Sequence, residues 1–170
     1  YETLIEEVAY TWFNRIIAIR FMEVNNYMPD RIRVLSSGVE GINEPEFINH
    51  IFETSFEFSE EEKYRIIELK TDGSNLAVDE LFQLLFIKQC NSLNANLPEL
   101  FEKTNDYTEL LLTVSYNDVE GIIYKLVHEV PEEDFDVTSE NGHGQIEIIG
   151  WLYQYYNTDP KAIVDKAVKA

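Results

Sequence analysis

Four arginines near the start of the sequence are the residues best suited to bind phosphate groups. Arg15 and Arg20 lie in one long apolar segment, and Arg31 and Arg33 follow shortly after it. A guanidinium group can donate two parallel hydrogen bonds to a phosphate or a carboxylate. We therefore expect these four side chains, joined by Lys88, to form any face that contacts a nucleic-acid backbone or a neighbouring domain.

The same arginines also have carboxylates nearby, which offers a simpler interpretation. Arg20 and Glu23 are three residues apart and can pair on the surface of a helix, and Asp30 directly precedes Arg31. Because isolated charge patterns are weak signals, ion pairing within the protein is the competing prediction.

Residues that could perform catalysis are not arranged in any known motif. His50, His128 and His143 are too far apart to predict a local metal site, and each is interpreted as a structural or exposed histidine. Glu132 and Asp134 could act as an acid pair, but acidic loops usually serve solubility and helix capping. The sequence has no Walker loop, GxSxG or GxGxxG. We assign no catalytic, cofactor-binding or metal-binding residue.

An aromatic cluster near the end of the sequence is its most unusual local feature. On a helix, Trp151 and Tyr155 would share one face and Tyr156 would lie on the next. Tyrosine and tryptophan are favoured at interfaces because they combine a large apolar area with a polar tip. These three side chains are candidate docking aromatics, with an ordinary core helix as the alternative.

The charge of the chain limits its partners. There are 32 acidic and 13 basic side chains, which gives a net charge of −19. The acids concentrate between residues 99 and 147, where thirteen acidic side chains face two basic ones. A domain that binds duplex DNA normally has the opposite sign. Acidity therefore favours a protein partner over direct DNA contact.

Composition indicates a folded protein in a reducing compartment. Leu, Ile, Val and Phe account for 54 of the 170 residues, well above the level at which a charged chain fails to collapse. No apolar stretch is long enough to cross a bilayer, and no signal peptide opens the sequence. The one cysteine, Cys90, lies in an apolar periodic segment that predicts a buried thiol. We expect a cytoplasmic protein without a membrane partner.

Two long helices are expected to position these residues. Segments 3–26 and 75–97 lack glycine and proline and repeat apolar residues at spacings of three and four. A shorter helix carrying Phe47, Ile48, Ile51 and Phe52 is expected after Pro45. Others are expected from 106, from the cap-like pair Asn117 and Glu120 to 130, from 145 and from 159, whereas 31–35 could be extended. Ser59 and Glu62 form a capping-box pattern, and Asp72-Gly73 ends that helix. The prediction is a mainly α, bundle-like domain with little or no β structure.

Several long strings in the sequence carry a family resemblance. EEVAYTWFNRIIAIRFMEVNNYMP (6–29), RIRVLSS (31–37), the segment 79–112, VPEEDF (130–135) and IEIIGWLYQYY (146–156) occur in this order. Together they resemble the region that precedes the catalytic domain in PglX-type adenine-specific DNA methyltransferases of the BREX phage-defence system. The match covers most of the chain.

The resemblance implies a parent enzyme that transfers a methyl group from S-adenosylmethionine to N6 of adenine, which requires the base to be flipped out of the duplex. The family's cofactor loop and Asn-Pro-Pro-aromatic motif do not occur here, so no catalytic residue carries over. We expect residues 1–170 to form a single helical domain, a fragment before the catalytic domain, that itself binds no cofactor.

The predicted role is a non-catalytic helical module that scaffolds the methyltransferase domain and aids DNA or partner binding. Its partners would be that domain, DNA through the parent protein, and other subunits of the defence system. The alternative is a free-standing acidic interaction protein, such as a DNA mimic. A mimic would need carboxylates at phosphate-like spacing along one face.

Overall fold

The computed structural model describes residues 2–98, 100–101, 113–138 and 140. These residues form helices α1 (Glu2–Val24), α2 (Glu46–Asn49), α3 (Glu60–Asp72), α4 (Asn75–Leu93) and α6 (Ile122–His128). Two 3-10 helices, η1 (Ile51–Glu53) and η2 (Glu132–Asp134), complete the elements, and the described residues contain no β-strand. The predicted mainly α fold with two long helices is confirmed.

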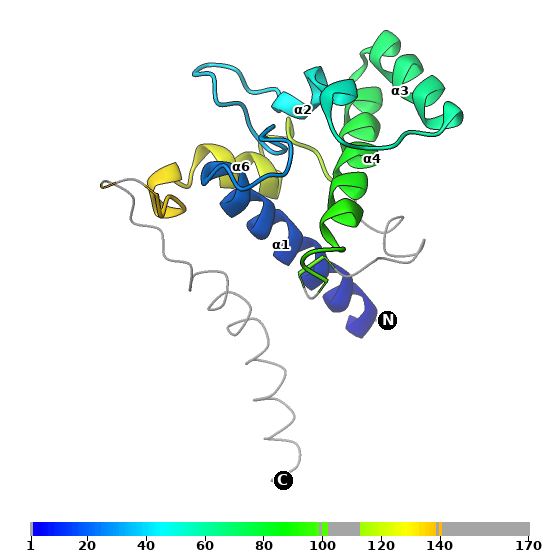
Figure 1. Cartoon of the computed structure of the whole chain (residues 1–170). Helices are drawn as coiled ribbons and strands as arrows, with labels where there is room; N and C mark the ends of the chain where they lie inside the picture. The colour runs from blue at the N-terminus through cyan, green and yellow to red at the C-terminus, as the bar shows by residue number, and fades with distance from the viewer. Residues whose placement is uncertain (1, 99, 102–112, 139, 141–170) are drawn as a thin grey trace.

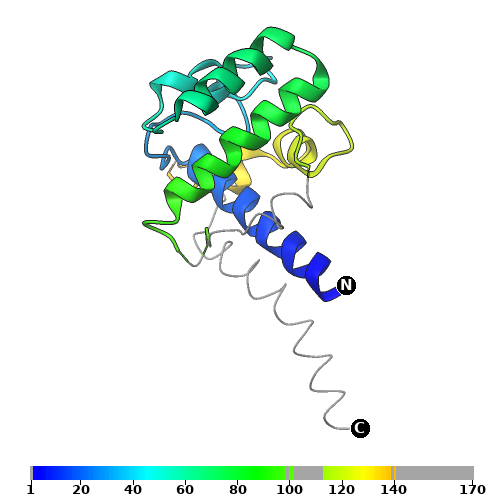
Figure 2. The same ribbon diagram turned by 90° about the vertical axis from the view of Figure 1, so that its right-hand side faces the viewer.

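The arrangement of the helices is simple (Figures 1 and 2). Helix α3 folds back along α4, and the later turns of α4 reach α1. Helix α6 lies beside α1. None of the described helices is long and apolar enough to cross a membrane.

Aromatic side chains join the helices into one core. The Phe82 ring of α4 lies 5.6 Å from Phe47, 5.9 Å from Phe86 and 5.4 Å from Tyr116, measured between centroids. Phe86 in turn stacks on Trp12 of α1 at 5.6 Å. Aromatic pairs contribute beyond the area that they bury. The chain of rings therefore connects α1, α2, α4 and the segment before α6.

The boundaries of α3 follow the expected capping signals. Ser59 accepts a hydrogen bond from the Glu62 amide, and the Glu62 carboxylate accepts one from the Ser59 amide, so the predicted capping box is complete. Gly73 ends the helix in the left-handed conformation at φ +64°, where a side chain would be strained. Ser74 then caps α4 by accepting from the Ala77 amide.

Other predicted helix boundaries are wrong. Pro45 precedes a helix of only four residues, and the expected helix continues as the separate turn η1. Helix α6 begins at Ile122 rather than 117, because the Ser115 hydroxyl accepts hydrogen bonds from the amides of Asn117 and Asp118 and closes a turn there. Local side-chain hydrogen bonds competed with the helix at this position. The helices predicted from 106, 145 and 159 lie mostly or wholly outside the described residues.

Candidate functional site

Arg20 and Glu23 form the centre of a buried polar site at the end of α1. Arg20 Nη1 donates to Glu23 Oε1 at 2.8 Å, and the two side chains are 1% and 0% exposed. The predicted pair therefore forms, but it lies inside the protein and not on the helix surface. A carboxylate and a guanidinium removed from water need further hydrogen bonds to offset the loss of hydration.

The segment after α1 supplies those hydrogen bonds. The amides of Val34 and Leu35 both donate to Glu23 Oε2 at 2.8 Å. The Ser36 hydroxyl donates to Glu23 Oε1 at 2.8 Å and accepts from Arg20 Nη1 at 3.0 Å. Residues 31–35 were predicted to be a strand or an extended segment. In the structure the Glu23 side chain holds this segment to α1 through the Val34 and Leu35 amides, and none of the described residues forms a strand beside it.

Glu132 joins the same site from the far side of the sequence. Its carboxylate lies 3.2 Å from Arg20 Nη2 and forms hydrogen bonds with both terminal nitrogens of Arg33. Partial burial acts to raise the pKa of Glu132, but the hydrogen bond and charge of Arg33 outweigh it, and the pKa lies below its ordinary value. The carboxylate is therefore held in its ionised form between two arginines.

Asn25 fastens the same distant segment through its amide group. Nδ2 donates to the carbonyls of Phe21 and Phe135, each at 2.8 Å, and Oδ1 accepts from the Val137 amide at 2.9 Å. Asn25 is buried, so each of these groups finds its partner away from water. Together, Asn25 and Glu132 attach residues 132–137 to the end of α1.

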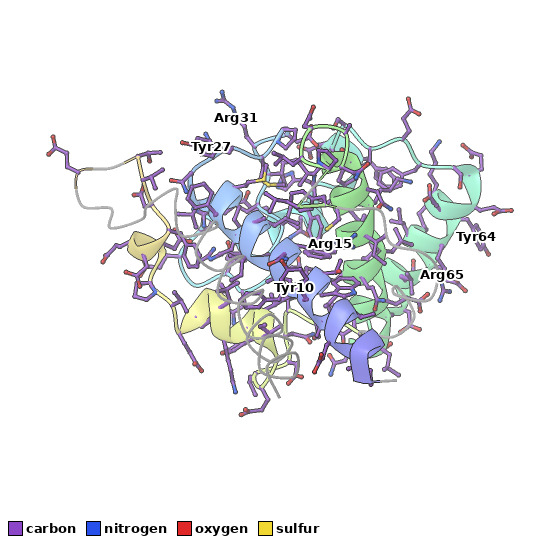
Figure 3. All side chains as sticks on the ribbon, turned by 90° about the horizontal axis from the view of Figure 1, so that it is seen from below. Tyr10, Arg15, Tyr27, Arg31, Tyr64 and Arg65 are labelled. Carbon is purple, nitrogen blue, oxygen red and sulfur yellow. The ribbon has the colours of Figure 1, made fainter. Side chains whose placement is uncertain are left out.

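The four candidate arginines are not gathered on one surface. Arg20 and Arg33 converge on Glu132, whereas Arg15 is fully buried elsewhere, with its guanidinium carbon 5.8 Å from the centre of the Trp12 ring. Figure 3 shows Arg15 inside the molecule and Arg31 projecting from it. Arg31 is exposed and has a left-handed backbone at φ +56°.

Lys88 lies apart from this site. Lys88 pairs with Glu62 at 2.6 Å, at the α3–α4 pair. Trp151, Tyr155 and Tyr156 lie outside the described residues. Cys90 is buried as predicted, and burial raises the pKa of its thiol to about 12 despite the opposing charge of Arg15. The thiol is thus unreactive at neutral pH.

Sequence reasoning missed Glu132 and Asn25 as members of the site. Both lie in strings that carry the family resemblance, 130–135 and 6–29, and that was the available signal. Three such strings, including 31–37, meet in space at the Arg20–Glu23 pair. In the part of the chain that the structure describes, no group of histidine, cysteine and carboxylate side chains could hold a metal ion.

The arrangement supports positioning of the chain rather than bond-making chemistry. The Arg20 guanidinium, the Glu23 carboxylate and the Ser36 hydroxyl are buried and hydrogen-bonded to one another. A groove of about 410 Å³ beside Arg33, Ser36 and Glu132 is bordered by residues 37–43 and the end of α6. The hydrogen bonds of the site hold residues 34–36, next to this groove, against the end of α1.

Comparison with known proteins gives a clear family relationship. No family model matches the chain. It is 50% identical over 169 residues to the adenine-specific methyltransferase PglX of Lacticaseibacillus casei (strain Zhang), covering 98% of this chain and 14% of that protein. It is 38% identical over 172 residues to the adenine-specific methyltransferase BrxX of Escherichia coli O9:H4 (strain HS), covering 100% of this chain and 13% of that protein.

The extent of these matches agrees with the strings found in the sequence. The aligned residues cover nearly the whole chain in both cases, whereas the chain spans only about a seventh of the length of either relative. The buried site at Arg20 therefore falls within the aligned part. The chain is thus similar along nearly its whole length to a region of two adenine-specific methyltransferases, PglX and BrxX, as its sequence resemblance predicted.

Proposed function

We propose that this chain is a non-catalytic helical module of an adenine-specific DNA methyltransferase in a BREX phage-defence system. In this proposal the parent enzyme transfers a methyl group from S-adenosylmethionine to N6 of adenine, and the module packs on the catalytic part and positions it. The homology to PglX and BrxX over nearly the whole chain supports the parent enzyme. The compartment would be the cytoplasm, where the DNA lies.

One observation carries the scaffold role: the arginines best placed to bind phosphate are occupied inside the fold. Arg20 is fully buried against Glu23, and Arg33 is engaged by Glu132. Arg31 remains exposed, on a chain whose net charge is −19. Phosphate contacts normally require several exposed cations on one face. A protein surface is therefore the better-supported partner of this module.

The DNA-mimic alternative has weaker support in the arrangement of charges. A mimic presents free carboxylates in a regular array along one face. On α3, Glu60 pairs with Lys63 at 2.7 Å, and Glu68 pairs with Arg65. Neutralised carboxylates on this acidic helix do not form such an array, so the scaffold proposal is preferred.

Methyl transfer is assigned to the part of the parent enzyme outside this chain. S-adenosylmethionine would bind there, since the resemblance places the cofactor loop and the Asn-Pro-Pro-aromatic motif beyond these residues. Arg31, the docking aromatics Trp151, Tyr155 and Tyr156, and other subunits of the defence system remain proposed contacts of the module.

The experiment is complementation between two purified polypeptides. The parent methyltransferase lacking residues 1–170 is assayed for N6-adenine methylation with and without this chain added as a separate protein. The proposal predicts impaired methylation by the truncated enzyme and recovery on addition of the wild-type chain. Full activity of the truncated enzyme alone would contradict a scaffolding role.

A further inference from the structure

Three phenylalanine rings form an exposed patch between η1 and α3. The Phe52 and Phe58 centroids are 6.0 Å apart, and the Phe56 and Phe58 centroids are also 6.0 Å apart. Phe52 is 62% exposed, and Phe56 and Phe58 are half-buried. We call Phe52, Phe56 and Phe58 the phenylalanine patch. It lies by the α2–α3 connection, at the end of the molecule opposite the start of α1 (Figure 1).

Two rings of the patch, Phe52 and Phe56, lie outside the hydrophobic core. Phe47, Ile48 and Ile51 of the same connection are buried at 1%, 4% and 2% exposure and already fill the space against α4. Phe58 also packs against this core, whereas Phe52 keeps most of its apolar surface in contact with water. A contiguous aromatic surface of this kind is typical of an interaction site.

The chemistry of a partner follows from the surroundings of the rings. The Lys88 ammonium lies 4.8 Å from the centre of the Phe58 ring, so one ring already takes a cation on its face. Residues 34–62 contain eight glutamates and no lysine or arginine, and three of these glutamates pair with His50, Lys63 or Lys88. Among these, Glu53 and Glu57 lie next to the patch in sequence and are exposed. An arginine side chain carries a positive charge, which the carboxylates attract, and a flat guanidinium group, which stacks on aromatic rings.

We propose that the phenylalanine patch docks an arginine-bearing segment of the methyltransferase polypeptide that lies outside these 170 residues. The inference rests on the proposed function and names the surface through which the module would act. Two observations select this occupant. The acidic surroundings of the rings complement arginine and repel DNA phosphates, and about six-sevenths of each relative lies outside the matched region.

The test places the photo-crosslinking residue benzoylphenylalanine at position 52 of the full-length parent methyltransferase. Phe52 is a suitable position because the probe is a derivative of phenylalanine and the Phe52 side chain is largely exposed. The control places the same residue at Ile5, which is 53% exposed in the first turns of α1. Mixing isotopically light and heavy protein separates crosslinks within one molecule from those between two copies.

The expected result is an intramolecular crosslink from position 52 to a peptide outside residues 1–170 that contains arginine, with no such product from position 5. A crosslink only between two copies, only to residues 1–170, only to another protein, or none at all would overturn the proposal.

A binding measurement gives a second, independent readout. Changing Phe52 and Phe56 to serine should weaken binding of the chain to the remainder of the enzyme at least tenfold, whereas Ile5→Ser should change it less than twofold. Equal effects would overturn the docking inference. If the wild-type chain binds but position 52 neither crosslinks nor affects affinity, the inference fails alone. If the wild-type chain does not bind, the proposed function fails as well.

Discussion

Arg20 and Glu23 are joined inside the protein, with Arg20 Nη1 2.8 Å from Glu23 Oε1 and both side chains almost completely shielded from water. The two residues lie one helical turn apart on α1. Both make further contacts, to Val34, Leu35, Ser36 and Glu132, while the buried Arg20 Nε has no hydrogen-bond partner among the described residues. This single contact therefore links the end of the first helix, the segment that follows it and a segment more than a hundred residues later.

Replacing Glu23 with glutamine should be strongly destabilising. Glutamine carries no charge to pair with Arg20. It keeps one acceptor oxygen, which can serve either Arg20 and Ser36 or the Val34 and Leu35 amides but not both sets. Breaking a buried pair in this way costs about 3 kcal/mol or more. Urea unfolding measures the loss. The control is Glu68→Gln, whose exposed pair with Arg65 contributes little because solvent screens it. Similar losses for both variants would show that burial of the Arg20–Glu23 pair adds nothing to its contribution.

Asn25→Ala should release the segment around η2. The substitution leaves the Phe135 carbonyl and the Val137 amide without the partners that Asn25 provides. Unsatisfied buried groups of this kind predict a loss of about 2–4 kcal/mol in the free energy of unfolding. Asn91→Ala, at an exposed position of α4, should change it by less than about 0.5 kcal/mol. Equal stability of the two variants would refute the attachment role.

The pH dependence of stability should report Glu132. Although partial burial opposes it, the hydrogen bond and charge of Arg33 lower its pKa below the ordinary value of 4.5. A lowered folded-state pKa stabilises the protein above the unfolded value, and this contribution is lost as the pH falls through the folded value. Glu132→Gln should therefore lose less stability than the wild type as the pH falls from neutrality through 4.5 and below.

The control for this titration is Glu133→Gln, because Glu133 is an exposed neighbour on the same turn. It should keep the wild-type pH dependence of the urea midpoint. If Glu132→Gln and the wild type lose stability in parallel, the carboxylate between Arg20 and Arg33 does not contribute through its ionised form.

Ser59→Ala should weaken the start of α3. The serine hydroxyl accepts from the Glu62 amide, and alanine leaves that amide without a side-chain cap. The expected loss is about 1 kcal/mol by thermal or urea unfolding. Ser92→Ala, at an exposed site in α4, should be neutral or slightly stabilising because alanine favours helix. No difference between these two serine variants would contradict the contribution of the capping box.

Local sequence signals predicted the structure correctly where the interacting residues lie close together in the chain. The capping box of Ser59 and Glu62, the stop at Gly73 and the buried Cys90 all depend on neighbours along the chain or on apolar spacing. The start of α6 was misplaced because Asn117 and Glu120 resemble a cap, whereas Ser115 closes a turn there. Competing local hydrogen bonds have similar energies, so the pattern alone could not decide between them.

The polar site was only partly predictable. The spacing of Arg20 and Glu23 identified the pair, but spacing says nothing of burial, and charged residues are usually exposed. Glu132 and Asn25 reach their partners across about 110 residues, which no local pattern encodes. Likewise, the exposure of Phe52 was unexpected, because helical spacing had assigned it to an apolar helix face.

The most direct test of the central claim is calorimetric titration of this chain with the separately expressed remainder of its parent methyltransferase, at low and high salt. A DNA duplex serves as the second titrant. The account predicts binding to the polypeptide that survives high salt, as an apolar interface does, and little binding to DNA at either concentration. Salt-sensitive binding to DNA with no binding to the polypeptide would contradict it.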